Sequence, residues 1–206
     1  MAIPTGKLTH EQERKLVSRA QRGDKAATRD LIHLHKDRLF AFIYRMVHNH
    51  HDSEEICQDA FLKAFASLDT FSSEYRFSTW LFTIGYRVCL NRLRRKHELT
   101  GGDDALPLQE AVAPADEESE LGSEEAAQLR QIVWSAVDKL SAPQRATVLL
   151  FYRHEMGCHE IAQVLELPVA TVKSHLHRAR GRLKDVLTEM DVHEFSFDRN
   201  RIADVG

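Results

Sequence analysis

The sequence contains no run of about 18 apolar residues, the length that a membrane-spanning helix requires. Residues 1–15 carry charges and lack the apolar stretch of a secretory signal. Cysteine is also scarce: Cys57, Cys89 and Cys158 lie far apart and form no CxxC pair. A small, odd number of cysteines within helical patterns favours reduced thiols over a disulfide framework. We therefore expect a cytoplasmic protein without membrane insertion.

Signals for β-strands, catalysis and metal binding are missing as well. No segment alternates apolar and polar residues, and no Asn-Gly or Asp-Gly pair marks a hairpin. The sequence has no Walker loop, no GxSxG and no HExxH. Histidines gather at 48–51 and 154–159, but neither group supplies the four fixed ligands of a zinc site. We expect no enzyme activity, and therefore no catalytic residue, cofactor, metal site or small-molecule substrate.

Helical periodicity runs through most of the chain, with apolar residues at spacings of three and four. Thr9 with Gln12 forms a capping box that begins the first predicted helix. Asp24 stands at the start of the second helix. Asp52 with Glu55 is a further box, and we expect it to begin the third helix.

Two more capping signals follow further along the chain. Ser78 or Thr79 is placed to cap a helix over residues 80–96. Ser141 with Gln144 is another capping box, with a proline in its first turn, where the missing N–H costs little. These signals extend the helical pattern over both halves of the sequence.

The helical pattern stops at an acidic segment in the middle of the chain. Residues 98–125 are rich in Asp and Glu and contain no Lys or Arg. Such a segment buries too little apolar surface to offset the entropy of ordering it. The sequence therefore predicts an all-α protein of two small helical domains, residues 1–97 and 126–188, joined by the acidic flexible linker 98–125 and followed by a tail, 189–206.

Charge is segregated along the chain, so the net charge of −3 conceals its distribution. Residues 76–96 and 168–184 contain several Lys and Arg and no acidic residue. These two basic stretches flank the acidic linker. Basic segments of this kind are the electrostatic signature of a nucleic-acid-binding protein.

The second basic stretch lies within a helix-turn-helix pattern. Two short helices are predicted over residues 158–165 and 169–187, with Ala162 small enough for a close helix crossing. Val172 and Leu176 turn toward the core, which leaves hydrogen-bonding and cationic side chains on the other side. Side chains of this kind suit base edges and phosphates in a major groove. The candidates for DNA contact are Thr171, Lys173, Ser174, His177, Arg178 and Arg180.

At this point a family resemblance becomes plain. The string TVKSHLHRARGRL, residues 171–183, resembles the promoter-reading helix of the extracytoplasmic-function (ECF) RNA polymerase sigma factors of the sigma-70 family. Residues 52–65 resemble the polymerase-binding helix of that family. Residues 77–84, followed by Asn91, resemble its promoter-melting segment. The three segments occur in the family's order.

The resemblance implies a transcription initiation factor whose partners are bacterial RNA polymerase core, promoter DNA and an anti-sigma factor. It assigns the DNA-contact candidates of the helix-turn-helix to the minus-thirty-five element. The candidates for polymerase binding are Asp52, Glu55, Gln58 and Asp59. The candidates for holding and opening the minus-ten element are Phe71, Tyr75, Arg76, Arg87, Asn91, Arg92, Arg94 and Arg95.

Alternatives remain open at several points. His175 stands where the family commonly has arginine, and Cys158 where it commonly has a serine cap. Trp80 and Leu81 are interpreted more readily as core residues than as DNA contacts. The acidic linker either follows a basic channel of the polymerase or serves only as a spacer. The main alternative function is a helix-turn-helix regulator that binds DNA without polymerase.

Overall fold

The computed structural model describes residues 9–72, 74–99 and 124–189. All regular structure in these ranges is helical, which confirms the all-α prediction. The chain divides into two compact units, residues 1–107 and 108–206, referred to below as the N-terminal and C-terminal units. Most of the predicted linker and tail lies outside the described residues.

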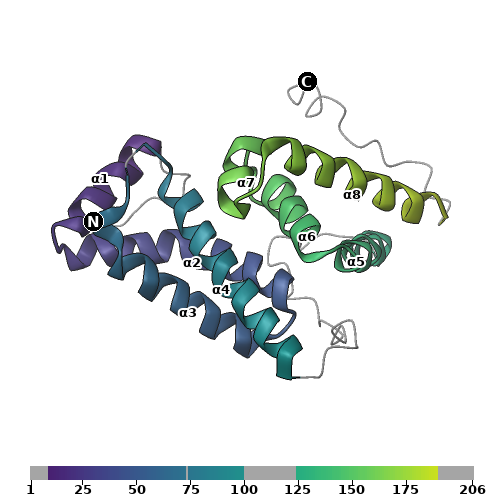
Figure 1. Cartoon of the computed structure of the whole chain (residues 1–206), viewed down its shortest axis with the longest axis horizontal. Helices are drawn as coiled ribbons and strands as arrows, with labels where there is room; N and C mark the ends of the chain where they lie inside the picture. Colours follow the sequence, from purple (N-terminus) through teal and green to yellow (C-terminus); the bar gives the residue numbers. More distant parts are fainter. Residues whose placement is uncertain (1–8, 73, 100–123, 190–206) are drawn as a thin grey trace. The chain divides into compact units, whose positions relative to one another are not determined.

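The N-terminal unit is a bundle in which α2 packs against α1, α3 and α4 (Figure 1). Its elements are α1 (His10–Gln21), α2 (Lys25–Val47), α3 (His50–Ala66), the 3-10 turn η1 (Leu68–Thr70) and α4 (Phe77–Leu99).

The helix starts of this unit follow the expected capping chemistry, with one correction. Thr9 and Gln12 form the predicted capping box, and the Asp24 carboxylate accepts hydrogen bonds from two backbone N–H groups of α2. The third helix begins at His50, before the predicted start at Asp52. Its N-cap is Asn49, whose side-chain oxygen accepts a hydrogen bond of 2.8 Å from the Asp52 N–H. The prediction was wrong because one left-handed residue, His48, suffices to end α2.

The start of α4 also differs from the prediction. Neither Ser78 nor Thr79 caps this helix, because α4 begins at Phe77 and extends to Leu99. The ring of Phe77 is 1% exposed and lies among aromatic neighbours, including Phe71 at 5.9 Å between ring centroids. The helix therefore begins three residues before the predicted start at residue 80, and burial of the Phe77 ring stabilises this first turn.

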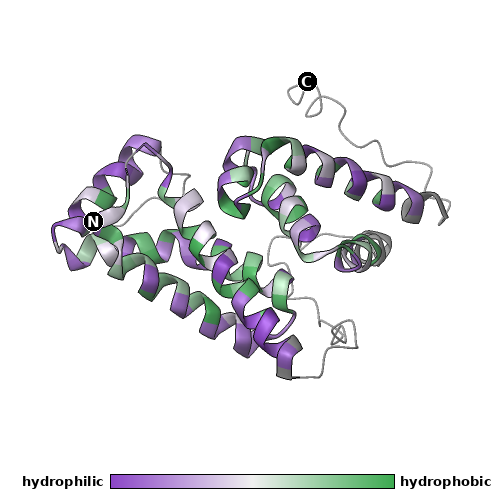
Figure 2. Ribbon diagram, viewed as in Figure 1, coloured by the Kyte–Doolittle hydropathy of each residue, from purple (hydrophilic) through white to green (hydrophobic). Residues whose placement is uncertain are grey.

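The core of the N-terminal unit lies where α2, α3 and α4 meet, and Figure 2 shows the hydrophobic residues along these helices. Its largest fully buried side chains are Leu31, Leu39, Phe42, Ile43, Ile56, Phe77, Leu81 and Phe82. The helices approach closely at Gly85, where a Cβ atom would lie 2.9 Å from Leu39 Cδ1. Glycine permits this contact between α2 and α4.

The C-terminal unit packs α5, α6 and α7 against the long helix α8. Its elements are α5 (Glu124–Asp138), α6 (Ala142–Val148), the π-helical turn η2 (Leu149–Arg153), α7 (Cys158–Leu165) and α8 (Val169–Glu189). The capping box of Ser141 and Gln144 is present as predicted. The π-helical turn has no counterpart in the prediction, because apolar spacing does not distinguish it from an ordinary helical turn.

The helix-turn-helix consists of α7 and α8, in agreement with the sequence pattern. Ile161, Val172 and Leu176 are buried, as the apolar spacing predicts. The turn begins at Glu166, which adopts a left-handed conformation with φ of 56°. The Leu167 N–H then donates a hydrogen bond of 3.0 Å to the Ala162 carbonyl and closes the turn. The fold thereby fixes which face of α8 is buried.

Candidate nucleic-acid and partner-binding surfaces

One face of α8 is exposed along its first four turns. The opposite face is buried through Val172, Leu176, Ala179 and Leu183, at spacings of four, three and four. The candidate side chains Lys173, Ser174, His177 and Arg178 are exposed, while Thr171 and Arg180 are half-buried at its edges. The structure therefore brings all six DNA-contact candidates of the helix-turn-helix onto this one helix, around a single face.

The fold holds the side chain of Arg180 on α8. Its Nε donates a hydrogen bond of 2.7 Å to the Tyr152 hydroxyl. The guanidinium carbon also lies 5.6 Å from the ring centroid of Phe151 and 5.8 Å from that of Tyr152, within cation–π range. The π-helical turn η2 thus positions Arg180.

His175 lies on α8 at a position where the resemblance led us to expect arginine. Burial lowers the pKa of His175 below its ordinary value, and the nearby charge of Arg178 lowers it further. The imidazole is therefore neutral at neutral pH and does not replace the missing positive charge. The positive charge of this helix comes from its Lys and Arg side chains.

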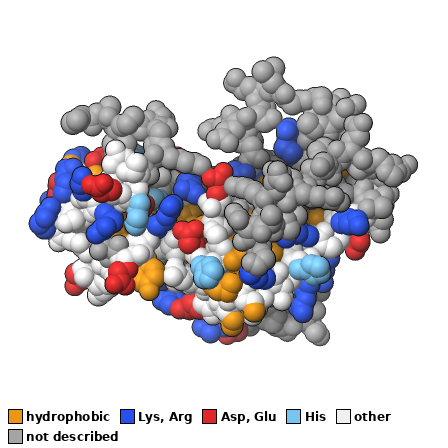
Figure 3. All heavy atoms as spheres, turned by 90° about the horizontal axis from the view of Figure 1, so that it is seen from above, with side chains coloured by type: hydrophobic (Ala, Val, Ile, Leu, Met, Phe, Trp, Pro, Cys, Tyr) orange, Lys and Arg blue, Asp and Glu red, His pale blue; other side chains and the backbone are white. Residues whose placement is uncertain are grey.

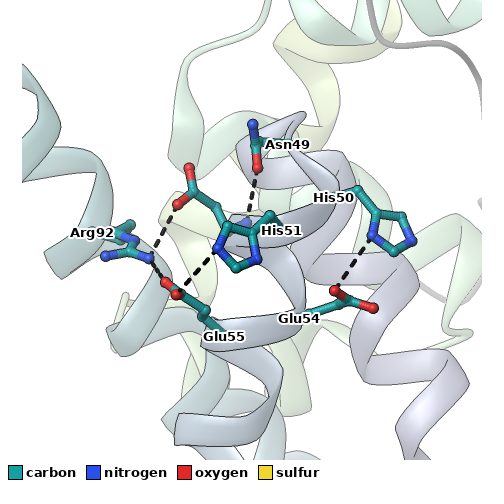
Figure 4. A network of polar contacts seen from close by, with 7 residues as sticks. Asn49, His50, His51, Glu54, Glu55 and Arg92 are labelled. Atoms are coloured by element: carbon teal, nitrogen blue, oxygen red, sulfur yellow. Dashed lines mark hydrogen bonds and ion pairs between the residues drawn. The ribbon is translucent and has the colours of Figure 1, made fainter.

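The polymerase-binding candidates lie on α3, and they are not equivalent. Glu55, Gln58 and Asp59 are exposed, whereas Asp52 is half-buried against α4. Arg92 of α4 forms an ion pair of 3.1 Å with Asp52 and a second, close pair with Glu55 (Figure 4). Two of the four candidates, Asp52 and Glu55, are therefore already paired with Arg92 within the unit.

Histidines extend this polar network at the start of α3. His51 Nε2 lies 3.5 Å from a Glu55 oxygen, and His50 Nδ1 lies 3.6 Å from a Glu54 oxygen. Figure 4 shows these contacts with Asn49 and Arg92 around the first turns of α3. Sequence reasoning missed the link from Arg92 to α3, because no local spacing relates residues on separate helices.

The minus-ten candidates occupy the loop before α4 and the exposed side of α4. Tyr75 is 47% exposed, and Arg76 beside it is exposed as well. Exposed candidates along α4 are Arg87, Asn91, Arg94 and Arg95, whereas Arg92 is half-buried in the network described above. The structure therefore places a loop with an exposed ring ahead of a row of cations.

Phe71 does not share this exposure. It is 8% exposed, and its ring centroid lies 5.2 Å from that of Trp80. Leu81 is fully buried and Trp80 half-buried, in keeping with their interpretation as core residues. Phe71 supports the loop from within the core, and its ring face is covered in this conformation.

A contact that local sequence patterns do not predict anchors this loop to α1. The Gln21 side-chain amide donates hydrogen bonds of 2.9 Å to the Leu68 carbonyl and 3.5 Å to the Phe71 carbonyl. These residues are about 50 positions apart, so only the tertiary structure reveals the pairing. The C-terminal end of α1 thereby holds the start of the candidate loop.

Two apolar hollows lie beside the candidate surfaces, one in each unit. The first, of about 450 Å³, runs between α2 and α3, and its rim includes Leu62, which is 62% exposed. The second, of about 380 Å³, lies among α5, α6, η2 and α8 around Val133 and Trp134. Exposed apolar surface at these hollows makes them candidates for protein–protein contact.

Two of the three cysteines have unreactive surroundings. Burial raises the pKa of Cys57 to about 11 and that of Cys89 to about 12. Both thiols are therefore protonated at neutral pH, and the thiolate is the reactive form. This chemistry does not favour a redox-sensing role for these two residues.

No helix within residues 9–72, 74–99 and 124–189 combines the length and apolar character needed to cross a membrane. Nor do three or more His, Cys, Asp or Glu side chains converge as metal ligands in that part of the chain.

Family models match both units. Sigma-70 region 2 matches residues 31–98, which include α3 and α4, and Sigma-70 region 4 matches residues 130–183, which include the helix-turn-helix. Together the matches cover more than half of the chain.

Individual proteins agree with the family models. The ECF RNA polymerase sigma factor SigW of Bacillus subtilis is 30% identical over 188 residues, which cover 86% of this chain and 97% of SigW. The RNA polymerase sigma-H factor of Pseudomonas aeruginosa is 30% identical over 185 residues, with coverage of 87% and 96%.

Solved structures share the fold. The sigma factor RpoE of Bartonella quintana, in complex with the anti-sigma factor NepR, matches with a TM-score of 0.65 and 27% identity over 78% of this chain and 96% of RpoE. CnrH in complex with the cytosolic domain of CnrY matches with a TM-score of 0.62 and 26% identity, over 86% of this chain and 97% of CnrH. On its sequence, its two family matches and its fold, the chain belongs to the ECF RNA polymerase sigma factors of the sigma-70 family.

Proposed function

We propose that the two units divide the work of promoter recognition. The N-terminal unit binds RNA polymerase core and opens the minus-ten element, and the C-terminal unit reads the minus-thirty-five element. The observation that carries this proposal is the match of regions 2 and 4, in that order, to two separate units with distinct basic surfaces. For the domain boundaries we keep the sequence prediction, residues 1–97 and 126–188, with residues 98–125 as the connecting segment.

Polymerase docking on α3 combines an apolar centre with an acidic rim. The hollow between α2 and α3 supplies the apolar surface, including the exposed Leu62. Gln58 lines the same hollow, and Asp59 follows it on the exposed side of α3. In protein interfaces, buried apolar anchors supply affinity while rim charges steer association. Asp59 is the acidic candidate for which the structure shows no engagement with Arg92.

Promoter opening relies on the loop before α4. An exposed aromatic ring at Tyr75 suits an unstacked base, because base–aromatic stacking contributes about 1–3 kcal/mol. The exposed cations of α4, Arg87, Arg94 and Arg95, suit the phosphates beside it, and Asn91 suits base edges. Phe71 takes part indirectly, by supporting the loop from the core.

Recognition of the minus-thirty-five element relies on α8. Its exposed Lys173, Ser174, His177 and Arg178 lie on the face opposite the buried stripe. This is the geometry of a recognition helix in a major groove. Arg180, positioned by Tyr152, is suited to a phosphate at the edge of that contact.

An anti-sigma partner completes the proposal. RpoE and CnrH, which share the fold, were each solved with a second protein, named in the first case as an anti-sigma factor. In this chain the apolar hollows offer such a partner a surface in each unit. Polymerase carries out the chemistry of transcription, so the chain acts without catalysis of its own. Its place of action is the cytoplasm.

A direct test is binding to RNA polymerase core that has been freed of sigma factors. We expect the purified chain to coelute with core as a stable holoenzyme. A folded chain that binds DNA but never coelutes with core would instead support the stand-alone DNA-binding regulator. Asp59→Lys serves as the matched variant, since it reverses an exposed charge on α3 at a position for which the structure shows no ion pair.

A further inference from the structure

A buried polar pair joins α1 to α2 in the N-terminal unit. Glu13 of α1 is 8% exposed and His35 of α2 is 3% exposed. A carboxyl oxygen of Glu13 lies 3.0 Å from His35 Nε2. The other ring nitrogen, Nδ1, is buried without a hydrogen-bond partner in the part of the chain that the structure describes. Two apolar side chains of similar size would avoid the cost of burying these polar groups.

We propose that Glu13 and His35 are positioning residues for the loop before α4. Their contact sets the rotation of α1 on α2, and the rotation of α1 places the Gln21 side chain against the start of that loop. This inference rests on the proposed role of the loop in opening the minus-ten element.

The apolar contacts of α1 specify its rotation only weakly. The buried residues of this helix are Glu13, Val17 and Ala20, so its buried apolar part consists of a valine and an alanine. Apolar burial has no directional preference. A buried polar residue does specify how two helices meet, as a single polar side chain does when it fixes the register of a coiled coil. Glu13 supplies such a directional contact here.

His35 is the fixed side of the pair. Its ring centroid lies 5.4 Å from that of Phe77, in a tilted arrangement. Phe77 is 1% exposed and packs in turn against Phe71 and Trp80. The helix that carries His35, α2, packs against α1, α3 and α4. The pair therefore orients α1 against an imidazole that the rest of the unit holds in place.

Gln21 transmits the rotation of α1 to the loop. It lies about two turns beyond Glu13 on the same helix. Its amide donates hydrogen bonds of 2.9 Å to the Leu68 carbonyl and 3.5 Å to the Phe71 carbonyl. Each residue turns an α-helix by about 100°. A rotation of α1 well short of one residue's turn would therefore carry the amide away from both carbonyls.

The exposed charges of α1 do not fix its orientation. Lys15 and Glu11 form an ion pair of 2.8 Å, but their side chains are 72% and 77% exposed. Figure 3 shows Lys and Arg side chains gathered, with some acidic ones among them, at the end of the surface where Figure 1 draws α1. Ion pairs so exposed contribute little, because water screens them. The orientation of α1 therefore depends on the buried pair.

The test replaces both members of the pair, so that neither is left buried alone. Glu13→Leu/His35→Leu places apolar side chains at both positions, a change that often leaves stability equal or higher. Ile43→Val is the matched control, because it removes a methyl group from the buried side of α2 and leaves the pair intact. Urea unfolding shows that each variant is folded. If the double variant does not fold, Glu13→Ala takes its place.

The first measurement is binding of holoenzyme to a promoter fragment whose minus-ten region is already single-stranded. We expect the double variant to bind about 5- to 150-fold more weakly, the equivalent of one base–aromatic stack. Gln21→Ala should cause the same loss. Adding Gln21→Ala to the double variant should cause no further loss, because both changes act through one contact.

The controls distinguish positioning from a general effect on the fold. Glu13→Gln keeps an oxygen that accepts a hydrogen bond from the imidazole, so it should bind like the wild type. Ile43→Val should do so as well. Wild-type binding by the double variant, or a further loss when Gln21→Ala is added to it, would overturn the proposal.

Fluorescence of Trp80 separates this inference from the proposed function. The ring centroids of Trp80 and Phe71 are 5.2 Å apart, and Trp134→Phe leaves Trp80 as the single tryptophan. Without polymerase or DNA, the double variant and Gln21→Ala should shift its emission to the same longer wavelength, and Ile43→Val should not. Unchanged emission contradicts the role of the pair alone. Failure of the wild-type chain to form holoenzyme contradicts the proposed function, and the emission then still decides whether the pair positions the loop.

Discussion

The two units build their candidate surfaces in different ways. In the C-terminal unit every DNA-contact candidate comes from one helix, α8, and lies around one face of it. In the N-terminal unit the candidates come from α3, α4 and the loop before α4, and several of them contact one another. A surface on one helix follows from local sequence spacing, whereas a composite surface depends on how helices meet.

The largest expected effect concerns the fold of the C-terminal unit. Leu176→Ala removes a side chain that is 1% exposed beneath the recognition face. The resulting cavity should lower the stability of this unit by about 2–5 kcal/mol. Thermal unfolding should show one transition at a lower midpoint temperature, that of the C-terminal unit, while the transition of the N-terminal unit is unchanged. A single transition that shifts as a whole would show that the units do not unfold separately.

The composite surface is tested by charge reversal on α3. Asp59→Lys should weaken binding to polymerase core and leave stability nearly unchanged, because surface substitutions typically stay within about 0.5 kcal/mol. Asp52→Lys should weaken binding and also destabilise the unit, since it replaces the carboxylate that pairs with Arg92 at 3.1 Å by a like charge. Core binding and urea unfolding measure the two effects. Equal stability of both variants would show that the Arg92 network is unimportant.

Two of the cations of α8, Arg178 and Arg180, should differ in their contribution to DNA binding. Arg178→Ala should reduce the salt slope of duplex binding by about 0.9, the value of one phosphate contact. Tyr152→Phe removes the hydroxyl that holds Arg180 and should weaken binding less. The loss from Tyr152→Phe should disappear when Arg180 is already replaced by alanine. Persistence of that loss would mean that Tyr152 contacts DNA itself.

The smallest effect is a pH dependence within α8. Because the pKa of His175 is lowered in the folded state, protonation favours the unfolded chain. Its contribution to stability is therefore present above the ordinary histidine pKa and is lost as the pH falls through the lowered value. His175→Gln should lose less stability than the wild type between pH 7.5 and pH 5.5 in urea unfolding. An identical loss in both proteins would contradict this assignment.

The difference between the units also explains what the sequence could predict. The buried stripe of α8 and the helix-turn-helix follow from local periodicity and capping, and the structure confirms both. Other features depend on contacts between distant segments. These are the burial of Phe71, the pairing of Arg92 with α3 and the anchoring role of Gln21. The N-cap of α3 at Asn49 was missed because the single left-handed residue His48, which ends α2, cannot be read from local spacing.

The family resemblance supplied what local patterns did not. Spacing alone presents the acidic residues of α3 as an ordinary solvated face, while the resemblance assigns them to polymerase binding. In the structure Asp52 and Glu55 also form ion pairs with Arg92, so they do not serve docking alone. The assignment of each side chain to polymerase or promoter stays a prediction.

If the proposed function holds, this chain together with polymerase core selects and opens specific promoters. Initiation by core reconstituted with the purified chain, scored across a library of promoter sequences, measures this activity. We expect transcripts only from promoters that share two sequence elements, with Arg178→Ala weakening recognition of the upstream one. Initiation no different from that of core alone, by a chain that is folded and free of inhibitor, would refute the proposed function.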